Sequence, residues 1–568
     1  MYQLSEAKEK RIFWIFFILC QLVCITGWVI PLMDIDAAQY ANMSREMLLN
    51  KHYLEIYDLR HDYLDKPPMI FWLGSLSMRI FGIHDYAYRL PSLLFSQLAI
   101  FSTYKLARLF YSQRIALLSA LVLASCEATF LINHDVKTDT MLMGWVAFSL
   151  WQLAAWYQDQ KWRQLILASV GIAGGLLTKG PIAFMVPVFA FAPHFILHRS
   201  YRQFFRWQYL VMIGIIAVLL LPMSIGLYRQ FDLHPEKIMY GQKGISGLRF
   251  FYWTQSFGRI TGESTWHEND RFSFLFENML WGFMPWIVFF ILGFADDLIG
   301  IVRKRFTLSG REEWISTGGF AITYCALASS RAQLPHYIYV VFPLAAIITG
   351  KFLYRLIYES RMQKWLKPLT ILQFTMMCIT VLVLFTVLAY PFRPVDKTLL
   401  ILAVLICSAL IWILLKNKIE AAPLISVSVL TVAFVNLFLN LGFYPRLLEY
   451  QLSIPVSRWI NQQPVDRDRF YVYKLDEHES LHFYSNHFFR HVDNPDSLST
   501  GDYILTGDQG YRLLDTSLYR MAFAGSSFHV STLSLTFMNP ARRASELSPY
   551  YILEKIRKDP TSQGSSVP

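Results

Sequence analysis

Two acidic residues follow the first long apolar run of the chain. Asp34 and Asp36 come directly after residues 12–33, where a membrane helix would give way to water. A carboxylate at this depth could deprotonate an acceptor hydroxyl, because an ordinary pKa of ~3.9 leaves it ionised at neutral pH. A solvated aspartate that caps a helix beginning near Ala37 explains the same position. Spacing alone favours the capping interpretation.

A charged pair precedes two prolines in the sequence Asp65-Lys66-Pro67-Pro68. Paired prolines restrict the backbone and remove two hydrogen-bond donors, so they would hold the charges at the mouth of the apolar segment that follows. A lysine in that position could neutralise a lipid phosphate. An ordinary helix start with interfacial charges accounts for the pattern equally well.

Two further aspartates, Asp135 and Asp139, lie four residues apart after a predicted span. In a helix they would share one face, where they could bind a cation or position a sugar. Asp139 is also well placed to cap the next span. Glu127 is the acid placed deepest in an apolar run, and we interpret it as a buried structural partner rather than a catalytic group.

Cationic and hydroxyl side chains recur in the same predicted loops. Lys179 lies between two apolar runs, where an ionisable group costs about 2.5–3.5 kcal/mol and therefore needs a partner. It could bind phosphate, or it could snorkel to the interface. Arg259, His336 and Tyr337 can also donate to phosphate oxygens. A loop arginine and an aromatic belt explain them too, but all map to one side of the membrane in a single topology.

The elements that must position these residues are membrane helices. Of the 568 residues, 54% are hydrophobic and only 16% are charged, against roughly 25% charged in an average soluble domain. Apolar runs long enough to cross a ~30 Å hydrocarbon core recur along the chain. We predict about thirteen transmembrane helices, at residues 12–33, 89–107, 115–133, 141–157, 164–178, 181–197, 209–227, 273–295, 314–329, 337–353, 368–390, 398–415 and 422–441.

The charges of the loops predict the orientation. The net charge is +11, and the basic residues concentrate in alternate short loops, as the positive-inside rule requires. The protein is therefore predicted to be a multi-pass protein of the cell inner membrane, with a cytoplasmic N-terminus and a periplasmic C-terminal domain, and not to bind nucleic acid. Residues 69–83 are rather short for a span and could lie in the interface. If they cross, the parity of every later loop changes.

The chain changes character after residue 441. Residues 442–557 alternate between predicted strands, such as 469–473 and 502–505, and a predicted helix at 451–463. This pattern predicts a small extracytoplasmic α/β domain after a transmembrane domain at 1–441, with 558–568 a disordered tail. All six cysteines fall in apolar runs and show no disulfide or zinc spacing.

Taken together, the loop motifs resemble those of the GT-C-type glycosyltransferases, especially the group of 4-amino-4-deoxy-L-arabinose lipid A transferases and protein O-mannosyltransferases. The motifs run in the family's order over roughly residues 10–350. They depart from the common pattern at Ala37, Gln39 and Asp65. The segments that carry the resemblance are Asp36 with residues 40–47, Asp65-Lys66-Pro67-Pro68, Arg89-Leu90-Pro91-Ser92, residues 135–139, Thr178-Lys179-Gly180-Pro181 and Leu334-Pro335-His336-Tyr337.

The resemblance implies a GT-C-like fold with juxtamembrane helices in the loop at residues 34–88. It implies a polyprenyl-phosphate sugar donor and transfer of a hexose or pentose to a lipid A-like or protein acceptor, among membrane lipids. By the family pattern, Asp36 is the acid nearest the reacting centre. Asp65, Asp139 and Lys179 would shape the sugar pocket. The donor phosphate would be held by Lys66, Arg259 and Tyr337. We therefore predict Asp36, Asp65 and Asp139 as the catalytic residues, and we add Lys179 and His336 to the phosphate-binding candidates.

Two other features of this hypothesis stay open at the level of sequence. No cofactor is expected and the reaction does not demand a metal, although the acidic residues are compatible with a divalent ion. The main alternative is a lipid or glycolipid transporter or flippase, because transporters also mark their pathways with intramembrane charge. A paired set of broken helices, which would favour a transporter, is not visible in the sequence.

Overall fold

The computed structural model describes residues 6–34, 36–255, 258, 271–392, 397–399, 401–402, 404–405, 408 and 421–556. Its chain divides into two compact units. The first comprises residues 1–29, 43–384 and 401–440, and the second comprises residues 30–42, 385–400 and 441–568. The predicted span 398–415 lies mostly, and the predicted tail 558–568 wholly, outside the described residues.

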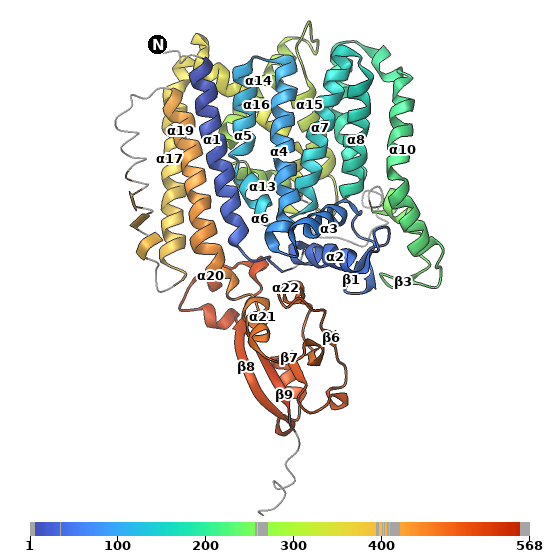
Figure 1. The fold of residues 1–568 in the computed structure, drawn as a ribbon. Helices are drawn as coiled ribbons and strands as arrows, with labels where there is room; N and C mark the ends of the chain where they lie inside the picture. The colour runs from blue at the N-terminus through green and yellow to red at the C-terminus, as the bar shows by residue number, and fades with distance from the viewer. Residues whose placement is uncertain are drawn as a thin grey trace, which may run out of the picture. The chain divides into compact units, whose positions relative to one another are not determined.

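The first unit is helical (Figure 1). Each predicted span other than 398–415 coincides with one helix or with two consecutive helices. These elements are α1 (Glu6–Thr26), η1 (Gly27–Val29), α4 (Asp85–Phe110), α5 (Gln113–Ala124), α6 (Glu127–His134), α7 (Thr138–Asp159), α8 (Trp162–Lys179), α9 (Ile182–Leu197), α10 (Gln208–Leu227), α13 (Phe274–Gly282), α14 (Ile287–Arg303), α15 (Ile315–Ala328), η5 (Pro335–Val341), α16 (Phe342–Tyr358), most of α17 (Gln363–Ala389) and α19 (Ala421–Phe438).

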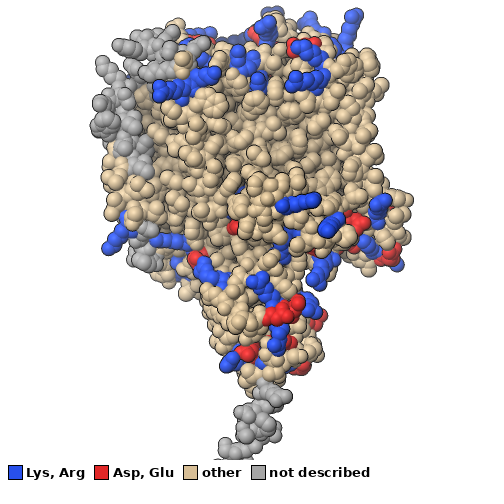
Figure 2. All heavy atoms as spheres, viewed as in Figure 1, with Lys and Arg blue, Asp and Glu red and all other residues tan. Residues whose placement is uncertain are grey.

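Length and hydropathy identify the chain as a multi-pass membrane protein. In the part of the chain that the structure describes, five helices are long and apolar enough to cross a membrane, and the bent pair α5 and α6 makes up to six. The count of about thirteen stays a prediction. Helices such as α7 are almost wholly buried among other helices and carry Thr, Ser and Gln, which lower their hydropathy. Figure 2 shows the same property from outside, as a broad band of the helical unit almost without surface charge.

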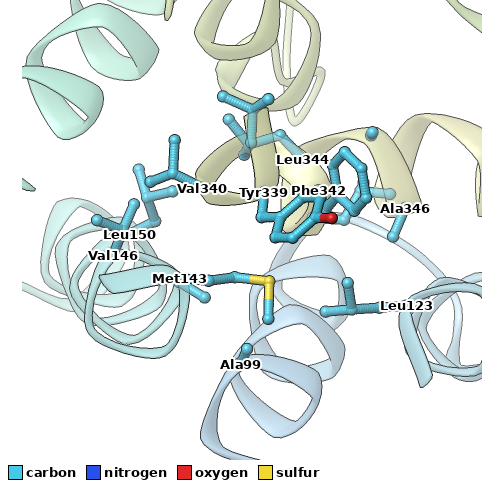
Figure 3. Close-up of a cluster of buried hydrophobic side chains, with 14 of the residues drawn as sticks. Ala99, Leu123, Met143, Val146, Leu150, Tyr339, Val340, Phe342, Leu344 and Ala346 are labelled. Carbon is cyan, nitrogen blue, oxygen red and sulfur yellow. The ribbon is translucent and has the colours of Figure 1, made fainter. Parts of the chain in front are cut away.

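The helices of the first unit pack around a continuous apolar core. Figure 3 shows Met143, Val146 and Leu150 of α7 opposite Tyr339 and Val340 of η5, with side chains of α4, α5 and α16 around them. These residues are buried. Because lipid tails are as apolar as leucine, such helices associate through close packing and hydrogen bonds rather than through the hydrophobic effect. The core therefore fixes where the polar ends of α7, α8 and η5 lie.

The loop at residues 34–88 contains two helices, α2 (Asp36–Asn50) and α3 (Met69–Phe81), and a short hairpin of β1 (Tyr57–Asp58) and β2 (His61–Asp62). With 13 residues, α3 is about 20 Å long, too short for a ~30 Å core. It packs on α4, and Figure 1 shows it lying across the ends of the long helices. The second predicted outer loop contains a π-helical turn η3 (Tyr228–Asp232), a hairpin of β3 (Ile238–Met239) and β4 (Gln242–Lys243), α11 (Gly247–Arg249) and η4 (Phe250–Thr254).

The second unit contains a five-stranded mixed sheet in the order β6-β5-β7-β9-β8. Strand β5 pairs in parallel with β6 and β7, whereas β9 pairs antiparallel with β7 and β8. Residues 30–42 also belong to this unit. The bounds are β5 (Phe470–Tyr473), β6 (Arg490–His491), β7 (Tyr503–Gly507), β8 (Tyr519–Ser527) and β9 (Ser548–Lys555), with helices α20 (Tyr444–Leu448), α21 (Ser453–Gln462), α22 (Glu479–Tyr484), α23 (Asp508–Leu513) and α24 (Leu535–Met538).

Candidate active site

A buried charged cluster forms where α7 begins, α8 ends and η5 begins. Lys179 Nζ lies 2.5 Å from Asp139 Oδ1, and His336 Nε2 lies 3.5 Å from Asp139 Oδ2. The side chain of Asp139 is 1% exposed. Lys179 Nζ also lies 3.8 Å from the centre of the Tyr337 ring, close enough for a cation–π contact. The structure therefore brings four predicted site residues together.

Local sequence explains why these side chains converge. Asp139 occupies the first turn of α7, and Lys179 is the last residue of α8. An acid at a helix N-terminus and a base at a helix C-terminus each complement the helix dipole. Gly180, at φ 101°, ends α8 in a conformation that L-residues avoid, and Pro335 begins η5.

The second group joins the two predicted outer loops. Lys66 Nζ lies 2.5 Å from Asp65 Oδ2, and both side chains are partly exposed. The Gln255 amide donates to Asp65 Oδ1 over 3.0 Å and also to the Asp65 carbonyl. Arg259, four residues after Gln255, lies outside the described residues. The segment that leads to this predicted phosphate ligand thus contacts the Asp65-Lys66 pair.

Asp36 is the first residue of α2 and is half-buried. It belongs to the second compact unit, whereas the other described candidates belong to the first. Asp135, the neighbour of the charged cluster in sequence, forms an ion pair of 3.7 Å with Lys137.

Arg89 has a structural role that its position in the sequence did not indicate. It is fully buried, and its guanidinium donates to the carbonyls of His134 (3.0 Å) and Trp28 (3.2 Å). Ser92 donates to the Ile132 carbonyl, one helical turn further along α4. The motif Arg89-Leu90-Pro91-Ser92 therefore holds the end of α6, from which the loop to Asp139 departs. The sequence signal that could have identified Arg89 is its charge at the start of an apolar run.

Glu127 marks the break between α5 and α6, which are bent by 50°. Its Oε2 accepts a hydrogen bond of 2.7 Å from Asn436 Nδ2 on α19. The backbone amide of Glu127 donates to the Met284 carbonyl. These contacts provide the structural partners that the sequence analysis expected for this acid.

No group of three or more His, Cys, Asp or Glu with the geometry of a metal site occurs among the described residues. The compatibility of the acidic side chains with a divalent ion stays a prediction. Lysine, arginine, histidine and tyrosine side chains suit a phosphate without one, because they donate to its oxygens.

Comparison with known proteins identifies relatives. Residues 65–225 match the family described as dolichyl-phosphate-mannose-protein mannosyltransferase. The undecaprenyl phosphate-alpha-4-amino-4-deoxy-L-arabinose arabinosyl transferase of Erwinia tasmaniensis is 26% identical over 321 residues, which cover 55% of this chain and 54% of that protein. The enzyme of the same name from Pseudomonas aeruginosa is 27% identical over 330 residues, 56% of each chain. The chain thus spans about half the length of the curated relatives it matches.

The fold is similar to a solved structure over nearly its whole length. The crystal structure of ArnT from Cupriavidus metallidurans bound to undecaprenyl phosphate superimposes with a TM-score of 0.69 at 17% identity, covering 94% of this chain and 97% of that one. The apo structure of the same protein gives a TM-score of 0.68 at 18% identity. The chain therefore has the fold of ArnT, and the resemblance that its loop motifs indicated, to arabinose transferases and protein mannosyltransferases, is confirmed.

Proposed function

We propose that this protein is a membrane glycosyltransferase that moves a sugar from a polyprenyl-phosphate carrier to a lipid A-like or protein acceptor. The observation that carries the proposal is the cluster of Asp139, Lys179, His336 and Tyr337, which the ends of α7, α8 and η5 bring together. A buried carboxylate with a lysine, a histidine and a tyrosine ring around it suits a sugar that carries a phosphate. The relatives' names describe the same class of donor.

The reaction is a displacement at the anomeric carbon. The bond from this carbon to the donor phosphate oxygen breaks as a bond to the acceptor oxygen forms, and polyprenyl phosphate leaves with the bonding electron pair. Lys66, Tyr337 and Arg259 would hold that phosphate and offset its growing charge, because donors fixed in advance stabilise charge where it develops. Asp65, Asp139 and Lys179 would line the sugar pocket, with His336 beside them.

The acceptor decides what Asp36 does. A hydroxyl acceptor must lose its proton as it attacks, so the carboxylate of Asp36 would take that proton as general base. A phosphate acceptor is already ionised and needs no base. In that case Asp36 would orient the acceptor or stabilise positive charge at the anomeric carbon.

For the transferred sugar we propose only a class, a hexose or a pentose. The relatives' names specify an aminoarabinose, but the identity of 26–27% extends over only about half of each chain. Ala37, Gln39 and Asp65 depart from the family pattern in the first outer loop. We place the protein in the bacterial inner membrane, with its site and its C-terminal domain on the periplasmic side.

A transfer assay tests the proposal. Purified protein would be incubated with radiolabelled sugar–polyprenyl phosphates and a cell-envelope extract, comparing wild type with Asp36→Asn, Lys66→Ala and the control Lys243→Ala. Lys243 is an exposed lysine in the second outer loop, so its loss should leave the rate unchanged. Label that moves to a new lipid or protein, and that Lys66→Ala abolishes, supports the proposal.

The Asp36→Asn variant separates the two kinds of acceptor. Loss of transfer in this variant is the result expected for a hydroxyl acceptor, and retained transfer indicates a phosphate acceptor that needs no base. Absence of transfer with every donor, together with movement of labelled lipid across reconstituted vesicles, would replace the glycosyltransferase with the transporter.

A further inference from the structure

The chain segment that leads into Asp36 is held by residues 441–568 of the second unit, which we call the C-terminal unit. The backbone amide of Leu32 donates to the hydroxyl of Tyr484 over 2.6 Å. The side-chain amide of Gln451 then bonds both ways, accepting from the Asp34 amide (2.9 Å) and donating to the Leu32 carbonyl (3.0 Å). Leu32 and Gln451 are buried. Unpaired backbone groups are costly there, so these bonds fix the path of the segment.

The carboxylate of Asp34 is the centre of this attachment. Its Oδ1 accepts from the backbone amide of Ser480 over 2.8 Å, and its Oδ2 accepts from the hydroxyl of Ser453 over 2.8 Å. His478 Nδ1 lies 3.5 Å from Oδ2. Hydrogen bonds to an ionised carboxylate are shorter and stronger than neutral ones. The first outer loop is therefore tied to residues more than 400 positions away in the sequence.

The ionisation of Asp34 agrees with this geometry. Burial raises the pKa of the carboxyl, but the hydrogen bonds and charge of His478 and the hydrogen bonds of Ser480 outweigh burial, so the net pKa lies below its ordinary value. Asp34 is thus an acceptor at neutral pH, which is the form that all three donors require.

A second attachment lies two turns along α2. The Asn42 side-chain amide donates to the Glu479 carbonyl over 2.6 Å and to Glu479 Oε2 over 3.0 Å. Asn42 is fully buried. Because Asp36 lies between Asp34 and Asn42 in the chain, the two attachments fix both where α2 begins and how its first turns are rotated.

We propose that Asp34 is a positioning residue, through which the C-terminal unit sets the direction in which Asp36 projects. This inference rests on the proposed function, since it gives the C-terminal unit a part in the same reaction. Asp34 does not act on the substrate. Its three donors hold the backbone from which Asp36 extends, in the way that supporting contacts orient a catalytic group.

The test measures donor kinetics and hydrogen exchange on the full chain. Asp34→Ala should lower kcat by about 10²-fold, the effect of misplacing a reacting group by ~1 Å, and leave KM for the donor within about twofold, because the predicted phosphate ligands lie elsewhere in the chain. Asp34→Asn should restore most of the rate, since its amide oxygen can still accept from the Ser480 amide. The matched control is Asp476→Ala, which removes an exposed carboxylate from the loop before His478.

Hydrogen exchange separates positioning from catalysis. Deuterium uptake by residues 30–42 should rise in Asp34→Ala and stay at the wild-type level in Asp34→Asn and Asp476→Ala. If Asp34→Ala does not fold, Ser453→Ala removes one donor of the three and should give a smaller change of the same kind. Lost kcat with unchanged exchange would overturn the inference by placing Asp34 in the reaction itself.

The remaining outcomes distinguish the inference from the proposed function. Wild-type kcat in Asp34→Ala, beside a wild type that transfers sugar, overturns the positioning role and leaves the glycosyltransferase standing. A wild type that transfers no sugar overturns the proposed function and the catalytic consequence of Asp34 together, while increased exchange in Asp34→Ala would still establish the attachment.

Discussion

Asp139 is the most buried carboxylate of the candidate site, so the stability of the fold depends on the groups that pair with its charge. We expect Lys179→Met to destabilise the fold by about 3–5 kcal/mol, because it leaves a buried charge without its main partner. Asp139→Asn combined with Lys179→Met removes both charges and should be less destabilising than Lys179→Met alone. Denaturant unfolding of the four proteins of this double-mutant cycle, in detergent, measures the difference.

A surface pair supplies the control for this cycle. Lys161 lies 3.4 Å from Asp159, and its side chain is 71% exposed. Lys161→Met should leave the stability nearly unchanged, since water screens the pair. Equal effects of Lys161→Met and Lys179→Met would contradict the assignment of a buried pair at Asp139.

The residue types of the site were visible in the sequence, but their partners were not. Charged residues at the ends of apolar runs stand out because the bilayer penalises them, and this signal identified Asp139, Lys179 and His336. That Asp139 contacts both Lys179 and His336 depends on how α7, α8 and η5 pack, and no local pattern encodes it. Gln255 is neutral and gives no signal at all, although it contacts Asp65.

At the scale of elements, α10 approaches the first outer loop closely enough to require a glycine. A Cβ built at Gly226 would lie 2.0 Å from the Leu54 carbonyl oxygen, whereas one at Gly214, on the same helix, meets nothing within 4 Å. The hairpin begins three residues after Leu54, at Tyr57, and the side-chain amide of Gln230 both accepts from the backbone amide of Ile56 and donates to its carbonyl. The loop that leads to Asp65-Lys66 is thus fixed against the end of α10.

These two glycines form a matched pair of substitutions. Gly226→Ala should destabilise the protein by about 1–3 kcal/mol, because a backbone oxygen cannot move aside as a side chain can. Gly214→Ala should be neutral, or stabilising by up to about 1 kcal/mol through helix propensity. Thermal unfolding in detergent measures both. Equal melting temperatures for the two variants would show that α10 does not approach Leu54 in this way.

The C-terminal sheet carries a pH-sensitive contact beside β5 and β6. Glu477 accepts hydrogen bonds from His482 (2.5 Å) and His491 (2.9 Å). The hydrogen bond to Glu477 raises the pKa of His491, against the opposing effect of its partial burial. A raised histidine pKa contributes stability that is fully present below the unfolded value of ~6.5 and is lost as the pH rises through the folded value.

We therefore expect the urea midpoint of the C-terminal unit to fall as the pH rises above about 6.5. The change should be under about 1 kcal/mol, because the His491 side chain is 45% exposed. Pulse proteolysis of the full chain in urea, at a series of pH values, measures the unfolding of this unit. His491→Gln should flatten the profile, and an unchanged slope in that variant would assign the pH dependence to another group.

At the scale of the whole molecule, hydropathy located the helices well because each predicted span had to be long and apolar. The charges at their ends were harder to interpret. Arg355 follows the predicted span 337–353 in the sequence, yet it pairs with Asp296 and Asp297 of α14, and Lys351 Nζ lies 2.6 Å from Asp297. Part of the positive charge that predicted the cytoplasmic side is therefore neutralised within the helices, which a count of lysines and arginines cannot reveal.

The orientation of the chain is consequently the prediction that most needs a direct measurement. With α3 too short to cross, five predicted spans separate Ser309 from Ser517, and one predicted span, formed by α13 and α14, separates Lys243 from Ser309. An odd number of crossings places Ser309 on the side opposite to both of the other residues. All three are exposed, so single cysteines at these positions, in a background without the six native cysteines, report on the topology.

A membrane-impermeant maleimide applied to intact cells should label Lys243→Cys and Ser517→Cys, and it should label Ser309→Cys only after the inner membrane is permeabilised. Labelling of Ser309→Cys and Lys243→Cys from the same side would show that α13 and α14 form a re-entrant pair rather than one span. Labelling of Ser309→Cys and Ser517→Cys from the same side, with Lys243→Cys opposite, would instead show that the chain crosses the membrane an even number of times between residues 315 and 441, one more or one fewer than predicted. The expected pattern puts Asp139 and Ser517 on the side of a periplasmic acceptor, because four predicted spans separate Asp139 from Lys243 and six separate Lys243 from Ser517.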